Sequence, residues 1–375
     1  MISENVSSRL EFADLDPLGD LPAAGDWQQL CDGALDPNPF FGPAFLRPYV
    51  KNMAGAAVRL AVVRERDTGT WLMAAPVARR RIGLAVPVAT LWATDYSPLG
   101  TPLMHPGTDA EVVRCFFDGA AGPGGLLAIP YLPLASQTAS RLTGADIGPL
   151  AIAAREKRAG HDAGAAGEAQ LEAAFSGKRR KEMRRLLRRL DEDGASRFES
   201  LTESDASRGF EEFLALEASG WKGRSGTALI SKPQTAAFSL EAIAGLARLG
   251  RVRIDQFWSG DRLIASLVLI EAGGQVFSWK IAFDEAYGRY SPGAQIALYT
   301  FRQNLALPGF MGADSLAVPG HSMIEPLWRG RLETGTMVLA QGAAGSLKLR
   351  LATADLAAEQ ALRRLARSVR QRLKR

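Results

Sequence analysis

Three strand-like runs separated by very short turns constrain the fold most strongly. They occupy residues 251–258, 262–270 and 275–283 of the 375-residue chain, and each is apolar or alternates apolar and polar residues. Ser259–Asp261 and Ala272–Gly274 join them, and short glycine-containing connections of this kind are typical of β-hairpins. This segment therefore predicts an antiparallel meander.

The sequence after the meander predicts an α+β fold. A helix is expected from Gly293 to about Ala306, followed by strands at 314–318 and 331–340. The first half repeats this order more weakly. A short helix is expected from Ala44, strands at 57–64, 70–79 and 82–91, a helix at 109–119 and a strand at 126–130. We therefore predict two copies of one small fold, each a mixed, mostly antiparallel sheet flanked by helices.

The chain length also favours two domains, because one hydrophobic core rarely organises this many residues. The Gly/Ala-rich run 159–167 suits a flexible linker. The expected division is an N-terminal domain at 1–165, a second domain at 170–350, and a basic amphipathic helix at 351–375. Further elements are expected in the second domain, namely helices at 171–190, 205–218 and 234–249 and a strand at 197–201.

The sequence gives no sign of membrane insertion or secretion. It has no uninterrupted apolar run of about 18 residues, the length a spanning helix needs. The first residues lack both the basic and the apolar region of a secretory signal. We expect a cytoplasmic protein, with a peripheral position at the inner membrane face as the alternative.

Cysteine and histidine are too sparse for familiar metal or redox sites. Cys31 and Cys115 lie far apart and far from any histidine pair, so neither a CxxC motif nor a zinc site is expected. The three histidines are His105, His161 and His321. The prediction is a protein without a catalytic metal.

The net charge of +5 is distributed unevenly. Residues 178–190 contain eight basic residues and one acid, residues 363–375 contain seven basic residues and no acid, and the remainder is net acidic. This pattern does not favour a general nucleic-acid binder. The two basic helices, Lys178–Arg189 and Arg363–Arg375, could be solvated structural helices, contacts for an anionic substrate or polyanion, or membrane-surface helices.

The segment Tyr287–Ala294 carries the clearest chemical signal. A strand ends near Phe283, a polar loop follows, and Pro292 and Gly293 open the next helix. The free N–H groups and positive dipole of a helix start favour phosphate, and glycine lets the backbone approach it closely. Arg289 could add a charged donor. Such a segment is also an ordinary helix start, and the phosphate hypothesis requires that this start be accessible.

This segment resembles the acyl-CoA pyrophosphate loop of the GNAT acetyltransferases. Together with residues 176–186, 217–228 and 36–46, and Trp27, it resembles the cellulose-biosynthesis-type branch of that superfamily. The resemblance implies tandem GNAT-like domains, acetyl-CoA or another acyl-CoA as co-substrate, and kinship with FemAB-type aminoacyl transferases. The donor site implied comprises Arg289, Tyr290, Ser291, Gly293, Ala294 and Gln295. The Tyr-Lys pair that the branch tends to have before a tryptophan is missing from 314–328.

Acyl transfer needs a deprotonated nucleophile, a polarised carbonyl and alignment of the two reactants. The candidate general bases are Asp284, Glu285, His321 and Glu325, and Asp284 is preferred because it lies beside the loop. Helix capping is the alternative role for this aspartate. A backbone N–H around 277–281 would polarise the carbonyl, and Tyr290 could protonate the leaving thiolate.

An acceptor site is predicted around Gly220–Gly226. Trp221, Lys222 and Arg224 in this loop, with Lys280 on the strand, would suit an anionic or sugar-like acceptor or the adenine and 3′-phosphate of coenzyme A. Trp221 could equally anchor the loop to the core. The expected acceptor is a small molecule or saccharide bearing an amine or hydroxyl, such as an exopolysaccharide or cellulose precursor.

Three functions are weighed in a definite order. The first is an acyl-CoA-dependent N- or O-acyltransferase. The second is a FemAB-type enzyme that takes aminoacyl-tRNA as donor, which the basic helices favour but for which no long helical hairpin is expected. The third is a non-catalytic GNAT-like protein that binds a polysaccharide-synthesis or membrane partner, which the missing Tyr-Lys pair favours.

Overall fold

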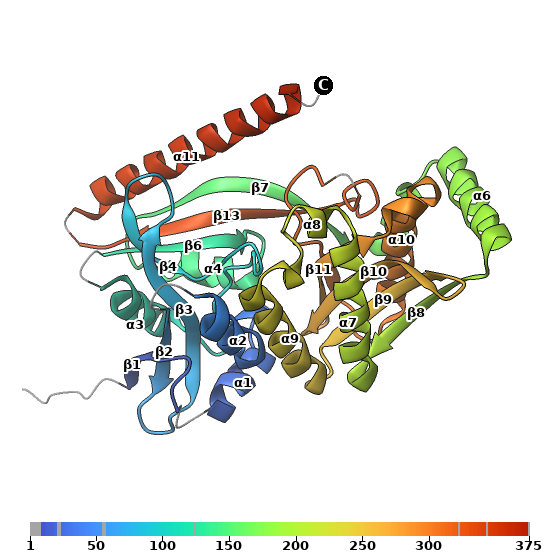
Figure 1. Ribbon diagram of the computed structural model, residues 1–375. Helices are drawn as coiled ribbons and strands as arrows, with labels where there is room; N and C mark the ends of the chain where they lie inside the picture. Colours follow the sequence, from blue (N-terminus) through green and yellow to red (C-terminus); the bar gives the residue numbers. More distant parts are fainter. Residues whose placement is uncertain are drawn as a thin grey trace, which may run out of the picture. The chain divides into compact units, whose positions relative to one another are not determined.

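The structure is a computed structural model that describes residues 9–20, 24–54, 58–122, 125–321, 323–342 and 344–373 (Figure 1). The chain divides into two compact units. The first contains residues 1–42, 55–156 and 333–375, and the second contains 43–54 and 157–332. This differs from the predicted contiguous division near 165–170, because helix α2 (Pro43–Met53) belongs to the second unit and the segment after residue 333 to the first.

The sheet of the first unit begins with an antiparallel series formed in chain order. Its strands are β1 (Leu10–Leu15), β2 (Arg59–Glu65), β3 (Trp71–Arg81) and β4 (Pro87–Leu91). Helix α3 (Ala110–Ala121) then leads to β6 (Leu126–Pro133), which pairs parallel to β4. Strand β13 (Gly330–Ala340) pairs antiparallel with β6. The remaining elements of this unit are α1 (Ala24–Asp32), η1 (Pro39–Phe41), β5 (Leu103–Met104), α4 (Gln137–Gly144) and α11 (Gly345–Leu373).

The second unit has the same order of strands. Its antiparallel series is β8 (Ser196–Thr202), β9 (Val252–Ser259), β10 (Arg262–Ala272) and β11 (Gln275–Phe283). Helix α10 (Pro292–Ala306) leads to β12 (Gly312–Asp314), which pairs parallel to β11, and β7 (Leu150–Asp162) pairs antiparallel with β12. The other helices are α5 (Gly164–Ala173), α6 (Gly177–Asp193), α7 (Glu203–Ser219), α8 (Trp221–Arg224), η3 (Leu229–Ser231), α9 (Pro233–Arg248) and η4 (Glu285–Tyr290).

The predicted pair of α+β units, each with a mixed and mostly antiparallel sheet, is therefore confirmed. The predicted linker at 159–167 is wrong, because β7 continues to Asp162 and α5 begins at Gly164. The single helix expected at 171–190 is divided between α5 and α6. Strand β7 escaped prediction because charged residues interrupt its alternation.

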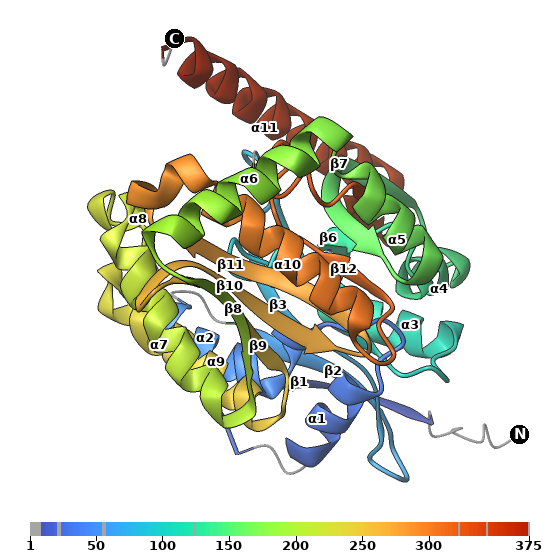
Figure 2. The same cartoon turned by 90° about the vertical axis from the view of Figure 1, so that its right-hand side faces the viewer.

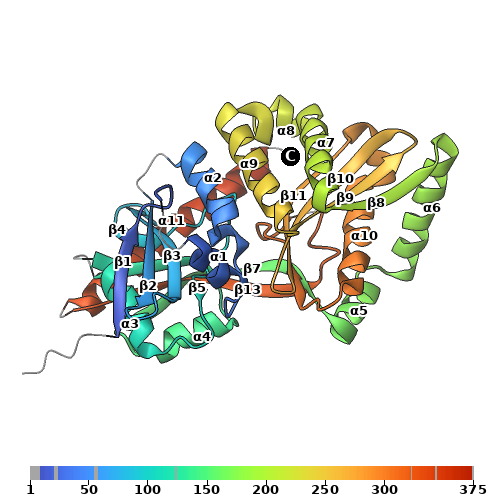
Figure 3. The ribbon, with the colours of Figure 1, turned by 90° about the horizontal axis from the view of Figure 1, so that it is seen from below.

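The sheet of the second unit is covered on both faces (Figures 2 and 3). Trp279 of β11 packs against aromatic residues of α2, α7 and α9, namely Phe45, Phe210 and Phe238. On the other face, Met183, Leu186 and Leu190 of α6 join a core with α10. The apolar stripe predicted for the basic helix is therefore the face that α6 buries, and its cationic residues remain exposed.

A buried polar network ties α10 to the strands beneath it. The fully buried carboxylate of Asp255 on β9 accepts hydrogen bonds from Ser200 (2.6 Å), Thr300 (2.6 Å) and Arg253 (3.1 Å). Arg253 also donates to Glu271 (2.8 Å) and to the side chain of Asn304. Buried charges are tolerated when every donor and acceptor finds a partner, so this network fixes α10 in one position.

His161 of β7 extends the network. Its Nε2 accepts from the Asn304 amide at 3.0 Å, and its ring stacks on Phe301 with ring centroids 3.8 Å apart. Burial lowers the pKa of His161 to about 4, and the charge of Arg253 acts in the same direction. His161 is therefore neutral at physiological pH.

We expect His161 to make stability depend on pH. A histidine whose pKa is depressed on folding contributes fully above about pH 6.5, and its contribution is lost as pH falls towards 4, because only the unfolded chain binds the proton in that window. The pKa difference corresponds to a loss on the order of 3 kcal/mol. Urea unfolding across this range should show a steeper decline for the wild type than for His161→Gln, whose amide oxygen can accept from Asn304. Parallel declines in the two proteins would contradict the assignment.

Candidate functional site

An open strand edge defines the candidate site in the second unit. Strands β11 and β12 pair only from Gln275, opposite Gly312, to Phe277, opposite Asp314. Strand β11 continues to Phe283, and in the described part of the chain no strand pairs with this edge beyond Phe277. A splayed parallel pair of this kind leaves backbone groups available to a bound molecule.

Two contacts of Asp314 show why β12 ends early. Its buried carboxylate pairs with Arg158 and accepts the Leu316 N–H at 2.9 Å. Leu316 has a φ of 53°, a left-handed conformation that an extended strand excludes. The strand expected at 314–318 is therefore wrong beyond Asp314, and the chain turns away from β11.

Strand β11 also carries a β-bulge in its pairing with β10, alongside the segment that β12 leaves unpaired. Val268 lies opposite Lys280 and Leu269 opposite Ser278, so Trp279 is an extra residue relative to β10. A bulge leaves its extra residue outside the regular ladder of hydrogen bonds. It falls inside the segment 277–281 that was expected to polarise a carbonyl group.

Lys222 holds α8 beside the same part of β11. Its ammonium donates to Glu217 (2.8 Å) and to the backbone oxygen of Ile281 (3.0 Å). The Glu217 side chain is only 2% exposed and also accepts the Leu229 N–H at 2.8 Å. This arrangement leaves Trp221 at the surface, 53% exposed. Lys222 thus has a positioning role, while Trp221 is free to meet a ligand.

His321 lies close to Lys222. Among the described residues, its Nδ1 is one of the few buried polar side-chain atoms without a hydrogen-bond partner. Burial lowers the pKa of His321, the nearby Lys222 lowers it further, and Glu325 opposes the shift. The imidazole is therefore neutral at physiological pH and can accept a proton.

The start of α10 is more enclosed than the phosphate hypothesis assumed. Ser291 has left-handed backbone angles (φ 54°, ψ 49°), and its carbonyl oxygen accepts the N–H groups of Ala294 and Gln295, each at 3.0 Å. Gly293 is buried, and a Cβ atom added there would overlap the sulfur of Met323. The Met323 side chain therefore packs against the backbone of Gly293 at the start of α10.

The acidic candidates are held by other groups. Asp284 caps η4 by accepting the Ala286 N–H (2.9 Å), and its second oxygen accepts from Arg262 (2.8 Å). Glu285 pairs with Arg224. Glu325 accepts the Gly320 N–H (2.5 Å) and pairs with Arg331 (3.3 Å). These contacts give all three carboxylates structural roles.

The remaining predicted residues fall into two groups. The Arg289 guanidinium lies 4.7 Å from the ring centroid of the buried Tyr290, so these two residues stay together at the loop. On β11, Lys280 Nζ lies 5.6 Å from the Trp279 ring centroid. The buried Gln295 side chain instead donates to the Met183 carbonyl of α6 at 3.0 Å. Gln295 therefore joins two helices, leaving only its backbone near the loop.

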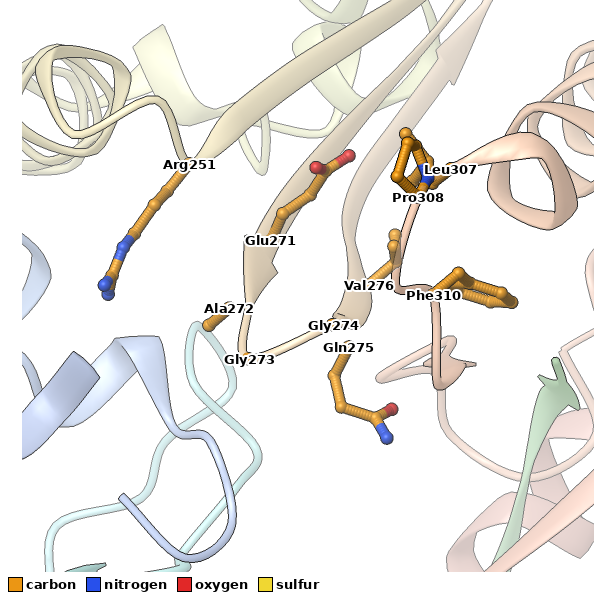
Figure 4. A pocket seen from close by; sticks show the side chains of 10 residues that line it. All are labelled: Arg251, Glu271, Ala272, Gly273, Gly274, Gln275, Val276, Leu307, Pro308 and Phe310. Carbon is orange, nitrogen blue, oxygen red and sulfur yellow. The ribbon is translucent and has the colours of Figure 1, made fainter. Parts of the chain in front are cut away.

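A separate pocket of about 260 Å³ lies at the opposite end of the β10–β11 hairpin (Figure 4). Its lining comes from the β10–β11 hairpin, the residue before β9 and the loop after α10, including Glu271, Gln275, Arg251 and Phe310. Burial raises the pKa of Glu271 despite the opposing charge of Arg253. None of the predicted site residues lines this pocket, so it is distinct from the β11 edge.

Sequence reasoning missed the residues that shape the site. Glu217 lies in a segment whose pattern predicts an ordinary helix. Met323 lies in a segment whose composition predicts an ordinary loop. A signal existed for Asp255 and Glu271, which are carboxylates inside strands made largely of apolar and buried residues. Such residues generally require a buried partner.

Comparison with known proteins finds a family that is similar to part of the chain. Residues 177–316, which include α6 and the β11–α10–β12 segment, match the family described as acetyltransferase (GNAT) domain. No curated protein sequence matches the chain significantly. Residues 177–316 therefore resemble a GNAT acetyltransferase domain, in agreement with the resemblance noted for the loop Tyr287–Ala294.

Solved structures share the fold over most of the chain. The crystal structure of FemX is 9% identical with a TM-score of 0.55, covering 88% of this chain and 97% of that one. A conserved protein of unknown function from Bacteroides thetaiotaomicron VPI-5482 is 11% identical with a TM-score of 0.55, covering 87% and 100%. The C-terminal domain of a putative lysylphosphatidylglycerol synthetase from Agrobacterium fabrum is 13% identical with a TM-score of 0.52, covering 87% and 95%. At these identities the likeness concerns the fold.

We predict that removing Lys222 destabilises the protein through Glu217. Lys222→Met leaves a buried carboxylate unpaired, which should cost about 2–4 kcal/mol, somewhat reduced because Lys222 is partly exposed. Adding Glu217→Gln should recover part of the loss. Chemical denaturation of both single variants and the double variant measures the coupling. Arg224→Ala, which breaks the exposed pair with Glu285, is the control and should change stability by less than about 1 kcal/mol. Additive effects at positions 217 and 222 would disprove the clamp.

Proposed function

We propose that the protein is an acyl-CoA-dependent N- or O-acyltransferase that uses the open edge of β11. The observation that carries this proposal is the early end of the β11–β12 pairing. It lies in the same unit as the bulge of β11, the half-buried neutral imidazole of His321 and a helix start formed by Pro292 and Gly293. These features supply, in one unit, groups able to align a thioester, polarise its carbonyl and accept a proton.

The proposed reaction is direct transfer. A backbone N–H at the Trp279 bulge donates to the thioester oxygen, where negative charge develops. His321 accepts the proton from the acceptor amine or hydroxyl, whose nitrogen or oxygen bonds to the acyl carbon. The carbon–sulfur bond then breaks, and the thiolate takes a proton from Tyr290 or from the imidazolium. His321 is preferred to Asp284 as the base because the aspartate is held by the η4 cap and Arg262.

For the donor, we propose that pyrophosphate contacts Arg289 and the backbone from Ser291 to Ala294. Met323 packs on Gly293, and we propose that its side chain moves when the donor binds. Acetyl-CoA is the simplest donor of this class.

For the acceptor, we propose an amine- or hydroxyl-bearing small molecule or saccharide. The exposed indole of Trp221 offers a flat apolar surface on α8, which the contacts of Lys222 hold in place. Aromatic faces of this kind suit sugar rings with a polar rim. An exopolysaccharide or cellulose precursor remains the proposed example.

Coenzyme A should raise the melting temperature of the wild type, because a ligand that binds only the folded state stabilises it by mass action. Gly293→Glu should abolish the rise by placing bulk and negative charge at the anion site. Met323→Ala should enlarge it at the same coenzyme A concentration, since the side chain that must move becomes smaller. Differential scanning fluorimetry with coenzyme A and acetyl-CoA measures all three.

The control is Gly144→Glu, because a Cβ atom at that position meets nothing within 4 Å. It adds the same charge and should keep the full shift.

Arg289→Ala tests the loop without crowding it and should weaken binding of coenzyme A several-fold. Absence of any shift in the wild type at millimolar coenzyme A would rule out the proposed donor.

His321→Asn should reduce transfer by roughly 10²-fold or more, the usual contribution of a general base. The coenzyme A thermal shift should persist, because His321 acts on the acceptor. Thiol release from acetyl-CoA in the presence of amine and sugar acceptors measures the first quantity. Unchanged transfer in His321→Asn, with transfer lost in Asp284→Asn, would return the role of base to the aspartate.

A second donor class has one observation in its favour. Helix α6 exposes eight cationic side chains in the same unit as the open edge and packs against η4, the helical turn before Ser291. The exposed cations are Lys178, Arg179, Arg180, Lys181, Arg184, Arg185, Arg188 and Arg189. Such a surface suits the phosphates of an aminoacyl-tRNA, the donor expected of FemAB-type enzymes.

The salt dependence of binding distinguishes the two proposed donors, aminoacyl-tRNA and acyl-CoA. Binding of tRNA should weaken steeply as salt rises and should be lost in the variant Arg184→Glu with Arg188→Glu. The coenzyme A thermal shift should change much less in either test. Binding of coenzyme A without transfer to any acceptor, including aminoacyl acceptors, would instead favour the non-catalytic alternative.

A further inference from the structure

Helix α11 packs on the first unit along one face only (red in Figure 1). Ala352 and Leu356 are buried in a small core that includes Val88 and Val338. The Asp355 carboxylate accepts the backbone N–H groups of residues 84–86 at 3.0 to 3.2 Å. The first half of α11 is therefore held in a definite rotation about its axis.

The opposite face of α11 is apolar and exposed. Leu347, Leu351, Leu362 and Leu365 are 60%, 56%, 53% and 61% exposed, and Ala354 and Ala358 between them are also exposed. At 100° per residue, these six residues lie within about 80° of arc, and Ala352 and Leu356 lie roughly opposite. We call these six residues the α11 stripe. A continuous exposed stripe of leucine is unusual in a soluble protein and indicates a partner.

The sequence of the same helix is strongly cationic. Residues 363–375 contain seven basic residues and no acid. Val369 and Leu373 continue the spacing of the stripe in the sequence, while the side chains of residues 363, 364 and 366–375 lie outside the described part. An apolar stripe on a cationic helix is the pattern of helices that lie in the headgroup region of anionic membranes.

We propose that α11 docks the first unit on an anionic lipid surface, with the α11 stripe inserted among the lipid chains. None of the described helices is long and apolar enough to span a bilayer, so the helix lies parallel to the surface. The basic residues attract anionic headgroups at about 1 kcal/mol each near the surface. The buried contacts of Leu356 stay in place, because Leu356 lies roughly opposite the stripe. Asp355 lies about 20° beyond one edge of the stripe, where it keeps its hydrogen bonds to the backbone of residues 84–86.

Charge and chemistry favour lipid over other occupants. A second copy of α11 would bring one acid-free basic segment towards another, whereas anionic headgroups neutralise it. A nucleic acid would neutralise the charge but would leave the leucines in water. An anionic membrane satisfies both the stripe and the charge.

The test is flotation of the full chain with phosphatidylcholine vesicles, with and without phosphatidylserine. The wild type should float with the anionic vesicles, should not float with the neutral ones, and should bind less as salt rises. Replacing Leu347, Leu351, Leu362 and Leu365 together with glutamine should reduce binding at least tenfold. The matched control replaces the exposed leucines of the second unit, Leu240 and Leu249, with glutamine and should float normally.

Folding and donor binding are checked separately. The stripe variant should keep its far-ultraviolet circular dichroism spectrum and its coenzyme A thermal shift, since it leaves the second unit unchanged. The proposal is overturned if the stripe variant still floats, if the wild type does not float, or if the stripe substitutions abolish self-association or RNA binding rather than flotation. Each outcome is independent of whether acyl-CoA is the donor.

Discussion

The early separation of β11 from β12 is the constraint on which the proposed chemistry depends. Three residue pairs join the strands, and Asp314, held by Arg158 and by the Leu316 N–H, then directs the chain away. If the pairing continued, β11 would have neighbours on both sides and no backbone groups for a ligand. Because this edge is open, a bound molecule could meet the groups that lie along it. They are the bulge at Trp279, the Lys222 ammonium on the Ile281 carbonyl, and His321.

A second constraint holds the helix beside that edge. Helix α10 contributes Thr300 and Asn304 to the network around Asp255 and Arg253, and Gln295 to the carbonyl of Met183. These bonds are directional, unlike apolar packing, so they set both the height and the rotation of α10 on the sheet. The position of Gly293 follows from them.

Local patterns in the sequence predicted the meander, helix α10 and the two-unit α+β organisation. Those features depend on hairpin turns and on periodicity, which neighbouring residues determine. The buried role of Glu217 could not be predicted, because it depends on how α7, α8 and the following loop pack together rather than on a local periodic pattern. The contact of Met323 with Gly293 joins residues 30 positions apart in the chain. Asp284 shows a related limit, since its capping role was foreseen as an alternative but its contact with Arg262, 22 residues earlier in the chain, was not.

The interleaved strands carry a consequence for synthesis on the ribosome. The first unit completes the pairing of β6 with β13, in which Thr334 lies opposite Pro133. Strand β6 therefore cannot pair with β13 until the second unit has been translated. Pairing over such a long separation is slow, and an unpaired strand edge can associate with other chains meanwhile. The nascent protein should need protection at β6 for longer than at β12, whose neighbour β7 precedes it in the chain.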